Sequence, residues 1–171
     1  MLKFIIPNES HKSQWEEIIA EWDDTRKRPR ILFQPSFEEF INRIGQLSQW
    51  DDKEKQVAKS SVFLLIDETV EKILGCLWLR HHIDFPIDRE YGGHIGYGIR
   101  PSERGKWYAT EMLRLGLDIM RSIGITQVHI SCHADNIASE NVILTNGWMI
   151  FGESMDKNQK KLRQYLINTL C

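Results

Sequence analysis

The sequence predicts an α/β fold, a β-sheet flanked by helices, in a single domain over residues 1–171. A chain of this length is about one domain's worth and can bury a core of its own. Runs of β-prone residues alternate along it with amphipathic helical patterns. Residues 92–109, GGHIGYGIRPSERGKWYA, have the pattern of a strand, a tight turn and the start of a helix. These three observations lead to the fold class.

A short strand and a helix open the chain. Leu2 to Ile6 forms the strand, and the proline that follows ends it because proline has no N–H to give to a neighbouring strand. Asn8 or Ser10 caps the helix, which continues to about Trp22 with its apolar residues on one face. The charged run from Asp23 to Arg30 then forms a loop.

A second helix precedes a β-hairpin. Ser36 caps this helix, in which apolar residues repeat at helical spacing from Phe37 to Ile44. Trp50 to Ser60 is polar and forms a loop or a ragged helical turn. Ser61 to Asp67 and Lys72 to Leu79 are β-prone runs on either side of a short turn, so we expect them to pair.

A strand and a long helix form the centre of the chain. After a loop from His82 to Tyr91, the strand covers His94 to Ile99, and Pro101 stops it. The helix runs from about Arg104 to Ile123, and Gly124 ends it.

Two strands enclose another helix, and the C-terminal tail is ambiguous. The strands cover Gln127 to Cys132 and Trp148 to Glu153, and the core of the helix is Ala138 to Thr145, closed by Asn146-Gly147. Lys160 to Leu170 carries enough charge for a helix, yet its residues also alternate as in a strand. Its pattern leaves both structures open.

The loop before the long helix has the features of an anion site. Backbone N–H groups at a helix N-terminus are unpaired, and the helix dipole is positive there. The segment resembles motif A of the GNAT superfamily of N-acetyltransferases: Gln or Arg, two residues, Gly, one residue, then Gly or Ala. Arg104 and Ala109 match its ends, and Ile99-Arg100-Pro101 resembles the Val-Arg-Pro that usually precedes it. Trp107 departs from the motif, because the family has glycine there.

A second segment resembles motif B of the same superfamily. That motif has an Asn, a small residue three places on, and a Gly-aromatic pair that closes the helix. Asn136, Ser139 and Gly147-Trp148 match it at the family's spacing. Ile143 departs from it, because many members carry a tyrosine there.

The resemblance extends over Leu79 to Gly147. This part is most similar to a bacterial subgroup of predicted acetyltransferases, in which an Arg-His pair, here Arg80-His81, precedes a Gly-Gly-His-Ile-Gly-Tyr segment, here Gly92 to Tyr97. The resemblance implies a GNAT-like mixed, mostly antiparallel sheet with a splayed central strand pair and flanking helices. It also implies that the ambiguous tail, Lys160 to Leu170, is a strand.

The resemblance further implies an acetyl-CoA-dependent N-acetyltransferase that acts on a primary amine of a small molecule. The pantetheine arm would lie along the central strand, the pyrophosphate on the loop amides, and motif B beside them. The implied cofactor-binding residues are Tyr97, Gly98, Ile99, Arg104, Gly105, Lys106, Trp107, Tyr108, Ala109, Thr110, Asn136 and Ser139. Several have a structural alternative: Arg104 and Lys106 as solvated surface residues, Asn136 as a plain helix cap, Ser139 as a small packing residue.

His94 and Tyr97 are the candidate catalytic residues. His94 stands where several family members carry a catalytic Glu, and imidazole titrates near neutrality, as a base for an ammonium group should. A structural histidine bonded across the sheet is the alternative. Because Ile143 cannot donate a proton, the leaving thiolate must be protonated by Tyr97, Tyr108 or water, or must leave unprotonated. A backbone N–H near Ile99 is the expected donor to the carbonyl oxygen.

Trp107 and Ile143 also favour a competing function, an acyl-CoA-binding domain with little or no turnover. Glycine in such a loop lets phosphate come close and permits φ > 0. We expect the Trp107 ring to point away from the phosphates and pack against a neighbour, leaving the CoA site intact but weakened. The other possibility is that the ring lies in the phosphate path. A generic α/β interaction domain would require both motif matches to be accidental.

The amino-acid composition limits the kinds of partner that the protein can bind. The 22 Lys and Arg nearly balance the 24 Asp and Glu, so no basic field is present to hold nucleic acid. No apolar run approaches the ~20 residues of a membrane span, and Met1 to Pro7 does not have the pattern of a signal peptide. Cys76, Cys132 and Cys171 have no metal-ligand spacing and are expected to be reduced thiols in the cytoplasm. No metal is expected, and a homodimer is left open.

Overall fold

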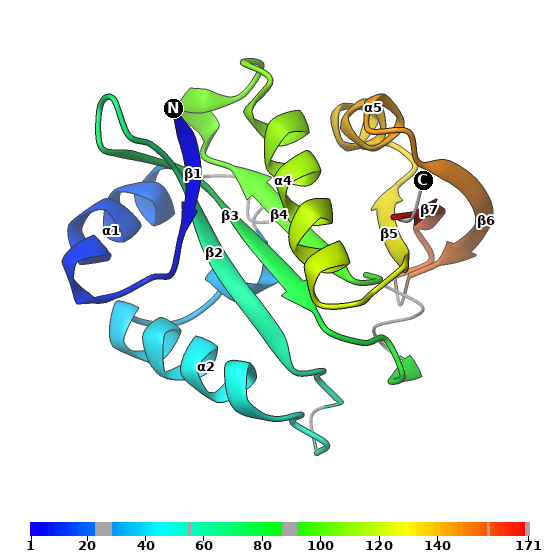
Figure 1. Ribbon diagram of the computed structural model, residues 1–171, viewed down its shortest axis with the longest axis horizontal. Helices are drawn as coiled ribbons and strands as arrows, with labels where there is room; N and C mark the ends of the chain where they lie inside the picture. The colour runs from blue at the N-terminus through cyan, green and yellow to red at the C-terminus, as the bar shows by residue number, and fades with distance from the viewer. Residues whose placement is uncertain (23–28, 55, 87–91, 157, 170–171) are drawn as a thin grey trace.

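The computed structural model describes residues 1–22, 29–54, 56–86, 92–156 and 158–169, and confirms the α/β fold class (Figure 1). The strands are β1 (Leu2–Ile5), β2 (Ser60–Asp67), β3 (Lys72–Arg80), β4 (Ile95–Ile99), β5 (Gln127–His133), β6 (Met149–Met155) and β7 (Lys161–Asn168). The helices are α1 (Lys12–Glu21), α2 (Phe37–Gln49), α4 (Tyr108–Ser122) and α5 (Ile137–Thr145). The described residues also form the 3₁₀ turns η1 (Glu9–His11), η3 (Arg30–Leu32) and η4 (Pro101–Glu103).

The strands form two antiparallel sheets that diverge at the centre of the molecule. One sheet has the order β1-β2-β3-β4 and the other β5-β7-β6. In the described residues, β4 and β5 are joined by an isolated bridge between Gly93 and Ile130, beside which the His94 N–H donates to the His129 carbonyl at 2.7 Å. Beyond it the two strands separate (Figure 1). The predicted splayed strand pair is therefore confirmed.

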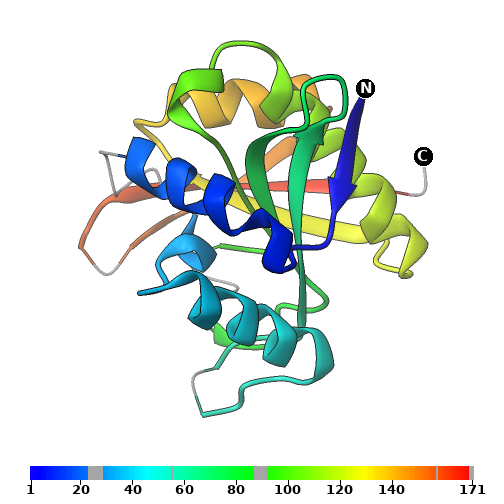
Figure 2. The same cartoon turned by 90° about the vertical axis from the view of Figure 1, so that its left-hand side faces the viewer.

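Helices cover both faces of the first sheet (Figure 2). Because alternate side chains of a strand point to opposite faces, Cys76 and Trp78 of β3 pack into a cluster with α1 and α2. Leu77 and Leu79 pack into a second cluster with α4, α5 and β5. Burial on both faces explains why β3 is a continuous apolar run and holds the centre of the fold rigidly.

The start of α4 corrects the sequence prediction. The helix begins at Tyr108, four residues later than expected, and residues 104–107 form a loop. Gly105 at φ 77° and Trp107 at φ 66° lie in the left-handed region, which cannot continue a right-handed helix. Gly124, at φ 82°, ends the helix as predicted.

The first helix and the tail resolve two open alternatives. Asn8 caps the 3₁₀ turn η1, where its side chain accepts from the Ser10 N–H, and α1 itself begins after His11 without a side-chain cap, so neither Asn8 nor Ser10 caps the helix. The tail is a strand, β7, which lies between β5 and β6 and pairs with both. The polar segment between α2 and β2 contains an isolated bridge between Asp52 and Val57. Large parts of the loops predicted at 23–30 and 82–91 lie outside the described residues.

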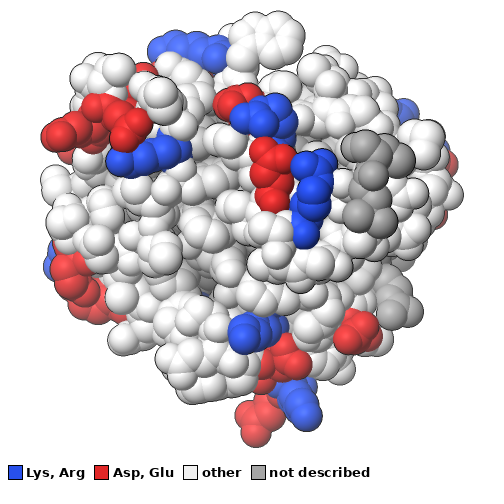
Figure 3. Space-filling view, in the orientation of Figure 1, with Lys and Arg blue, Asp and Glu red and all other residues white. Residues whose placement is uncertain are grey.

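The distribution of surface charge and the state of the cysteines bear on the predicted partners and location. On the face shown in Figure 3, Lys and Arg lie close to Asp and Glu rather than gathering in a basic patch. No helix in the described part of the chain is long and apolar enough to cross a membrane. Cys76 and Cys132 are free and buried, and Cys171 lies outside the described residues. The single-domain assignment, the cytoplasmic location and a homodimer stay predictions.

Candidate active site

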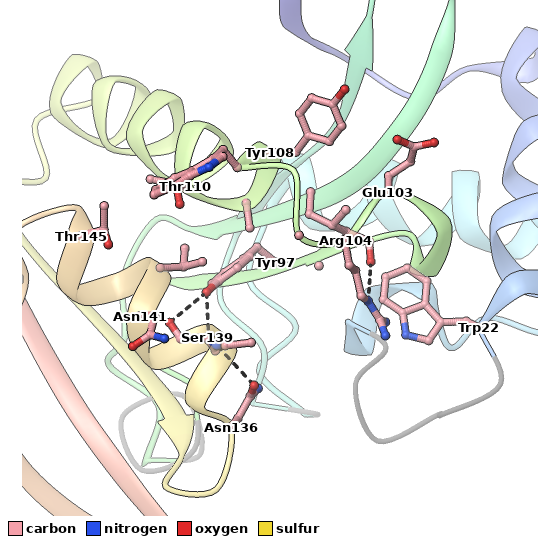
Figure 4. Close-up of a pocket in the computed structure, with 17 residues that line it drawn as sticks. Trp22, Tyr97, Glu103, Arg104, Tyr108, Thr110, Asn136, Ser139, Asn141 and Thr145 are labelled. Carbon is pink, nitrogen blue, oxygen red and sulfur yellow. Dashed lines mark hydrogen bonds between the residues drawn. The ribbon is translucent and has the colours of Figure 1, made fainter.

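A cavity of about 420 Å³ lies between the end of β4, the loop before α4, and α5 (Figure 4). All of the predicted cofactor-binding residues except Lys106 line it. The full lining is Trp22, Tyr97, Gly98, Ile99, Glu103, Arg104, Gly105, Trp107, Tyr108, Ala109, Thr110, Asn136, Ala138, Ser139, Asn141, Val142 and Thr145. The two motifs, far apart in sequence, therefore form opposite walls of one pocket.

The loop between β4 and α4 is anchored by a buried ion pair. Arg100 is 3% exposed, and its guanidinium binds the Glu21 carboxylate at the end of α1 and donates to the Ile73 carbonyl at 3.1 Å. The hydrogen bond from Arg100 lowers the pKa of Glu21 to about 2, so this carboxylate is ionised at neutral pH. Ser102 Oγ donates to the same carboxylate at 2.8 Å. These contacts fix the position of the loop that carries motif A.

The N-terminus of α4 faces the cavity. Trp107 occupies the cap position without a side-chain cap, so the amides of Tyr108, Ala109 and Thr110 have no intrahelical partner. All three residues line the pocket. Unpaired amides at the positive end of a helix dipole can hold a phosphate or pyrophosphate.

Arg104 is exposed, and its side chain lies against the pocket wall. Its Nε donates to the Ile99 carbonyl at 3.2 Å, and its guanidinium carbon lies 5.2 Å from the centre of the Trp22 ring (Figure 4). A guanidinium over an aromatic face is attracted by the ring's quadrupole. Arg104 is therefore held at the end of β4, where its remaining N–H groups can meet a negatively charged ligand.

Lys106 differs from the other predicted cofactor-binding residues in its position. It lies outside the pocket lining, and its Nζ donates to Glu103 at 2.8 Å. Hydrogen bonds from Lys106 and Lys72 lower the pKa of Glu103, which is itself buried in the pocket wall. This geometry favours the alternative of a surface residue, and a cofactor contact by Lys106 stays a prediction.

Tyr97 connects β4 to α5 across the gap between the sheets. Its hydroxyl lies 2.9 Å from Ser139 Oγ, and the Ser139 N–H donates to Asn136 Oδ1 at 3.3 Å (Figure 4). Asn136 is thus the N-cap of α5 and also lines the pocket, and its contact with the cofactor stays a prediction. Burial raises the pKa of Tyr97 well above its usual value, so the phenol stays protonated.

The comparisons with known proteins agree with this geometry. Residues 7–149 match the family described as the acetyltransferase (GNAT) domain. The chain belongs to the GNAT acetyltransferase family. The family and the fold are those of an N-acetyltransferase, and no curated protein matches the sequence.

Solved structures of other GNAT acetyltransferases share the fold. The ribosomal L7/L12 α-N-protein acetyltransferase in complex with coenzyme A is 18% identical, with a TM-score of 0.74 over 98% of this chain and 93% of that one. The ribosomal-protein-S5-alanine acetyltransferase from Vibrio fischeri is 18% identical, with a TM-score of 0.71 over 99% and 92%. A chimera containing the spermidine N-acetyltransferase from Vibrio cholerae is 13% identical, with a TM-score of 0.69 over 98% and 96%.

His94 of this GNAT acetyltransferase is not among the residues that line the pocket. The side chain is 6% exposed, and its Nδ1 accepts the His129 N–H at 3.0 Å. Burial, followed by the nearby His129 and Arg80, lowers the pKa of His94 to about 4. So weak a base is poorly matched to an ammonium group at neutral pH. The geometry favours the structural alternative, and catalysis by His94 stays a prediction.

Replacing His94 with glutamine should make the protein less sensitive to acid. Because the folded pKa of about 4 lies below the ordinary 6.5, the neutral ring favours the folded state fully above about pH 6.5. This contribution of about 3 kcal/mol to the free energy of unfolding is lost as the pH falls from about 6.5 toward 4. Urea unfolding of the wild type and of His94→Gln at pH 7 and 4.5 measures this loss of stability. Equal pH dependence would contradict the buried neutral ring, and a roughly 10²-fold loss of kcat in His94→Gln would instead support a catalytic base.

Six of the residues that line the pocket were not predicted, and one of them is Glu103 in η4, which is held by Lys72 and Lys106. The residues of α5 that line the pocket beside Ser139 are three or four positions apart, so extending motif B along the helix face would have found them: Ala138, Asn141, Val142 and Thr145. Trp22 carries no local signal, because its helical pattern is that of a core residue and only the tertiary fold brings it to β4. Ile143, where the family often has tyrosine, is fully buried in the core. In the described residues, no group of three His, Cys, Asp or Glu could hold a metal ion.

Proposed function

We propose that this GNAT acetyltransferase transfers the acetyl group of acetyl-CoA to a primary amine. The observation that carries the proposal is the single cavity in which the uncapped amides of α4, the diverging strand β4 and motif B on α5 meet. The CoA complex of a structural neighbour supports the choice of cofactor.

The pyrophosphate of CoA would bind the amides of Tyr108, Ala109 and Thr110, with Arg104 beside it. The pantetheine arm would lie along β4 at Tyr97 to Ile99. On the side facing β5, this part of β4 pairs with no strand in the described residues, so its backbone groups can bond the amides of pantetheine. With the pyrophosphate at α4 and the pantetheine arm along β4, the thioester would lie between the splayed strands β4 and β5.

The chemistry is direct transfer. The lone pair of a neutral amine attacks the thioester carbonyl carbon, and the negative charge on the carbonyl oxygen is stabilised by a backbone N–H near Ile99. The carbon–sulfur bond then breaks, CoA leaves as the thiolate, and the amine loses its proton to solvent or to a base. Tyr97 is the proposed proton donor to this thiolate, because its phenol stays protonated and lines the cavity, and solvent, which takes up the proton of the amine, returns a proton to the phenolate.

We propose a small-molecule amine as the acceptor. The spermidine N-acetyltransferase among the structural neighbours supports this class, whereas the two ribosomal-protein acetyltransferases support a protein α-amino group. Turnover with polyamines, amino acids, aminoglycosides and peptides bearing a free N-terminus compares the two classes directly.

Acetyl-CoA should raise the melting temperature of the protein. A ligand at 100 times its Kd stabilises the folded state by about 2.7 kcal/mol, which corresponds to a shift of roughly 5–10 °C for a protein of this size. Thermal unfolding with and without acetyl-CoA measures the shift, and isothermal calorimetry gives the Kd. Absence of binding at millimolar CoA would refute the proposed function.

A CoA-binding protein without turnover is the second candidate. The observation that favours it is Ile143, whose fully buried side chain can give no proton to a leaving thiolate. Binding of CoA without release of thiol across the amine panel would support it over catalysis.

A further inference from the structure

Trp107 is a large aromatic residue in an unusual place. It takes φ 66° and ψ −1°, in the left-handed region that glycine adopts freely and an L-residue adopts only at a cost. The prediction that its ring packs against a neighbour is wrong, because Trp107 is 74% exposed. In the described part of the chain its side chain has no hydrogen-bond or ring partner. Among the described residues, no contact compensates for the strained backbone and the exposed ring.

The position of Trp107 identifies what the ring could contact. Trp107 lines the cavity and directly precedes the amides of Tyr108 to Thr110, which are proposed to hold the pyrophosphate. The pantetheine arm leaves this point inward, toward Tyr97. The nucleoside on the other side of the pyrophosphate must therefore leave outward, past the exposed ring. Of the described residues that line the cavity, Trp107 is the one large apolar side chain that is exposed.

We propose that the Trp107 indole stacks on the adenine of CoA and is the residue that recognises the nucleotide half of the cofactor. This inference rests on the proposed function. Purine bases stack on aromatic side chains through their π-faces, and covering the ring also removes its apolar surface from water. The ring would thus take the role of a binding platform at the position where the family's motif has glycine.

The experiment uses calorimetry to measure the affinity of five proteins for three ligands. CoA carries both halves, 4′-phosphopantetheine lacks the nucleoside, and adenosine 3′,5′-bisphosphate lacks the pantetheine arm. The proteins are the wild type, Trp107→Ala, Trp107→Gly, Trp107→Phe and Trp50→Ala. Trp50 is a matched control, because it is 56% exposed and lies outside the cavity lining.

We expect Trp107→Ala and Trp107→Gly to bind CoA and adenosine 3′,5′-bisphosphate about tenfold more weakly, and 4′-phosphopantetheine as the wild type does. Trp107→Phe should keep most of the affinity, and Trp50→Ala all of it. Unchanged CoA affinity in Trp107→Ala would overturn the inference while leaving the proposed function intact. Tighter CoA binding by Trp107→Gly would overturn it in favour of a ring that obstructs the phosphates. Failure of the wild type to bind CoA would instead refute the proposed function.

Discussion

Tyr97→Phe should lower kcat by about 10²-fold while leaving the Kd of acetyl-CoA nearly unchanged, if Tyr97 is the donor to the leaving sulfur. The substitution keeps the ring that lines the cavity and removes the hydroxyl alone. That hydroxyl lies at the junction of β4 and α5, 2.9 Å from Ser139 Oγ, beside the site proposed for the thioester. An interaction made only as the carbon–sulfur bond breaks affects the rate and not the ground-state affinity.

The pH dependence follows from the environment of the phenol. Burial raises the pKa of Tyr97 above its ordinary value near 10, so the protonated form that donates a hydrogen bond persists across the usual assay range. The rate should therefore show no alkaline decline attributable to Tyr97 below about pH 10. Steady-state and single-turnover kinetics between pH 6 and 10 measure both the loss and its pH profile.

Two variants serve as controls for Tyr97. Tyr108→Phe removes the hydroxyl of another tyrosine that lines the cavity, and Ser139→Ala removes the hydrogen-bond partner of Tyr97 without removing the donor. Both should retain kcat within about tenfold, far less than the loss expected of a general acid. If Tyr97→Phe retains the wild-type kcat and Tyr108→Phe does not, the donor has been assigned to the wrong tyrosine. If both retain it, the thiolate leaves without a tyrosine donor.

Gly75→Ala should reduce the free energy of unfolding by about 3 kcal/mol, at the upper end for overpacking of a core. Gly75 pairs with Ile99 across β3 and β4. A Cβ at this position would lie 2.4 Å from the Gly98 carbonyl oxygen, 2.8 Å from Met112 Cε and 2.9 Å from Ile99 Cδ1. The nearest of these atoms belongs to the backbone of β4, so a flexible side chain cannot relieve the clash. The strand itself must move.

Movement of β4 should also weaken CoA binding, because Gly98 and Ile99 line the cavity. Urea unfolding and calorimetry on the same variant test both effects. Gly45→Ala is the matched control: it lies inside α2 with no atom within 4 Å of a Cβ, so it should stabilise the protein by about 0.5–1 kcal/mol. A Gly75→Ala variant within about 0.5 kcal/mol of the wild type would show that the sheet absorbs the methyl group.

Much of the fold could be read from local patterns. The hairpin of β2 and β3 and the position of α5 follow from alternation and capping signals in neighbouring residues. The helix α4 begins four residues later than the sequence predicts, because a sequence pattern does not show the left-handed φ angles of Gly105 and Trp107. The tail, with a pattern that fits helix or strand, became a strand because its position between β5 and β6 satisfies its backbone on both sides.

For the cavity, too, the sequence alone determined some of the contacts, and only the tertiary structure decided the others. Each motif is contiguous or helical, so its residues share one wall whatever the rest of the chain does, and nearly all of the predicted cofactor contacts line the pocket. The contacts between distant elements follow from packing: Trp22 beneath Arg104, Tyr97 against Ser139, and His94 buried against His129. Desolvation lowers the pKa of His94, and the backbone dihedral angles at Trp107 expose its ring. Both the desolvation and these angles are fixed only once the chain has folded.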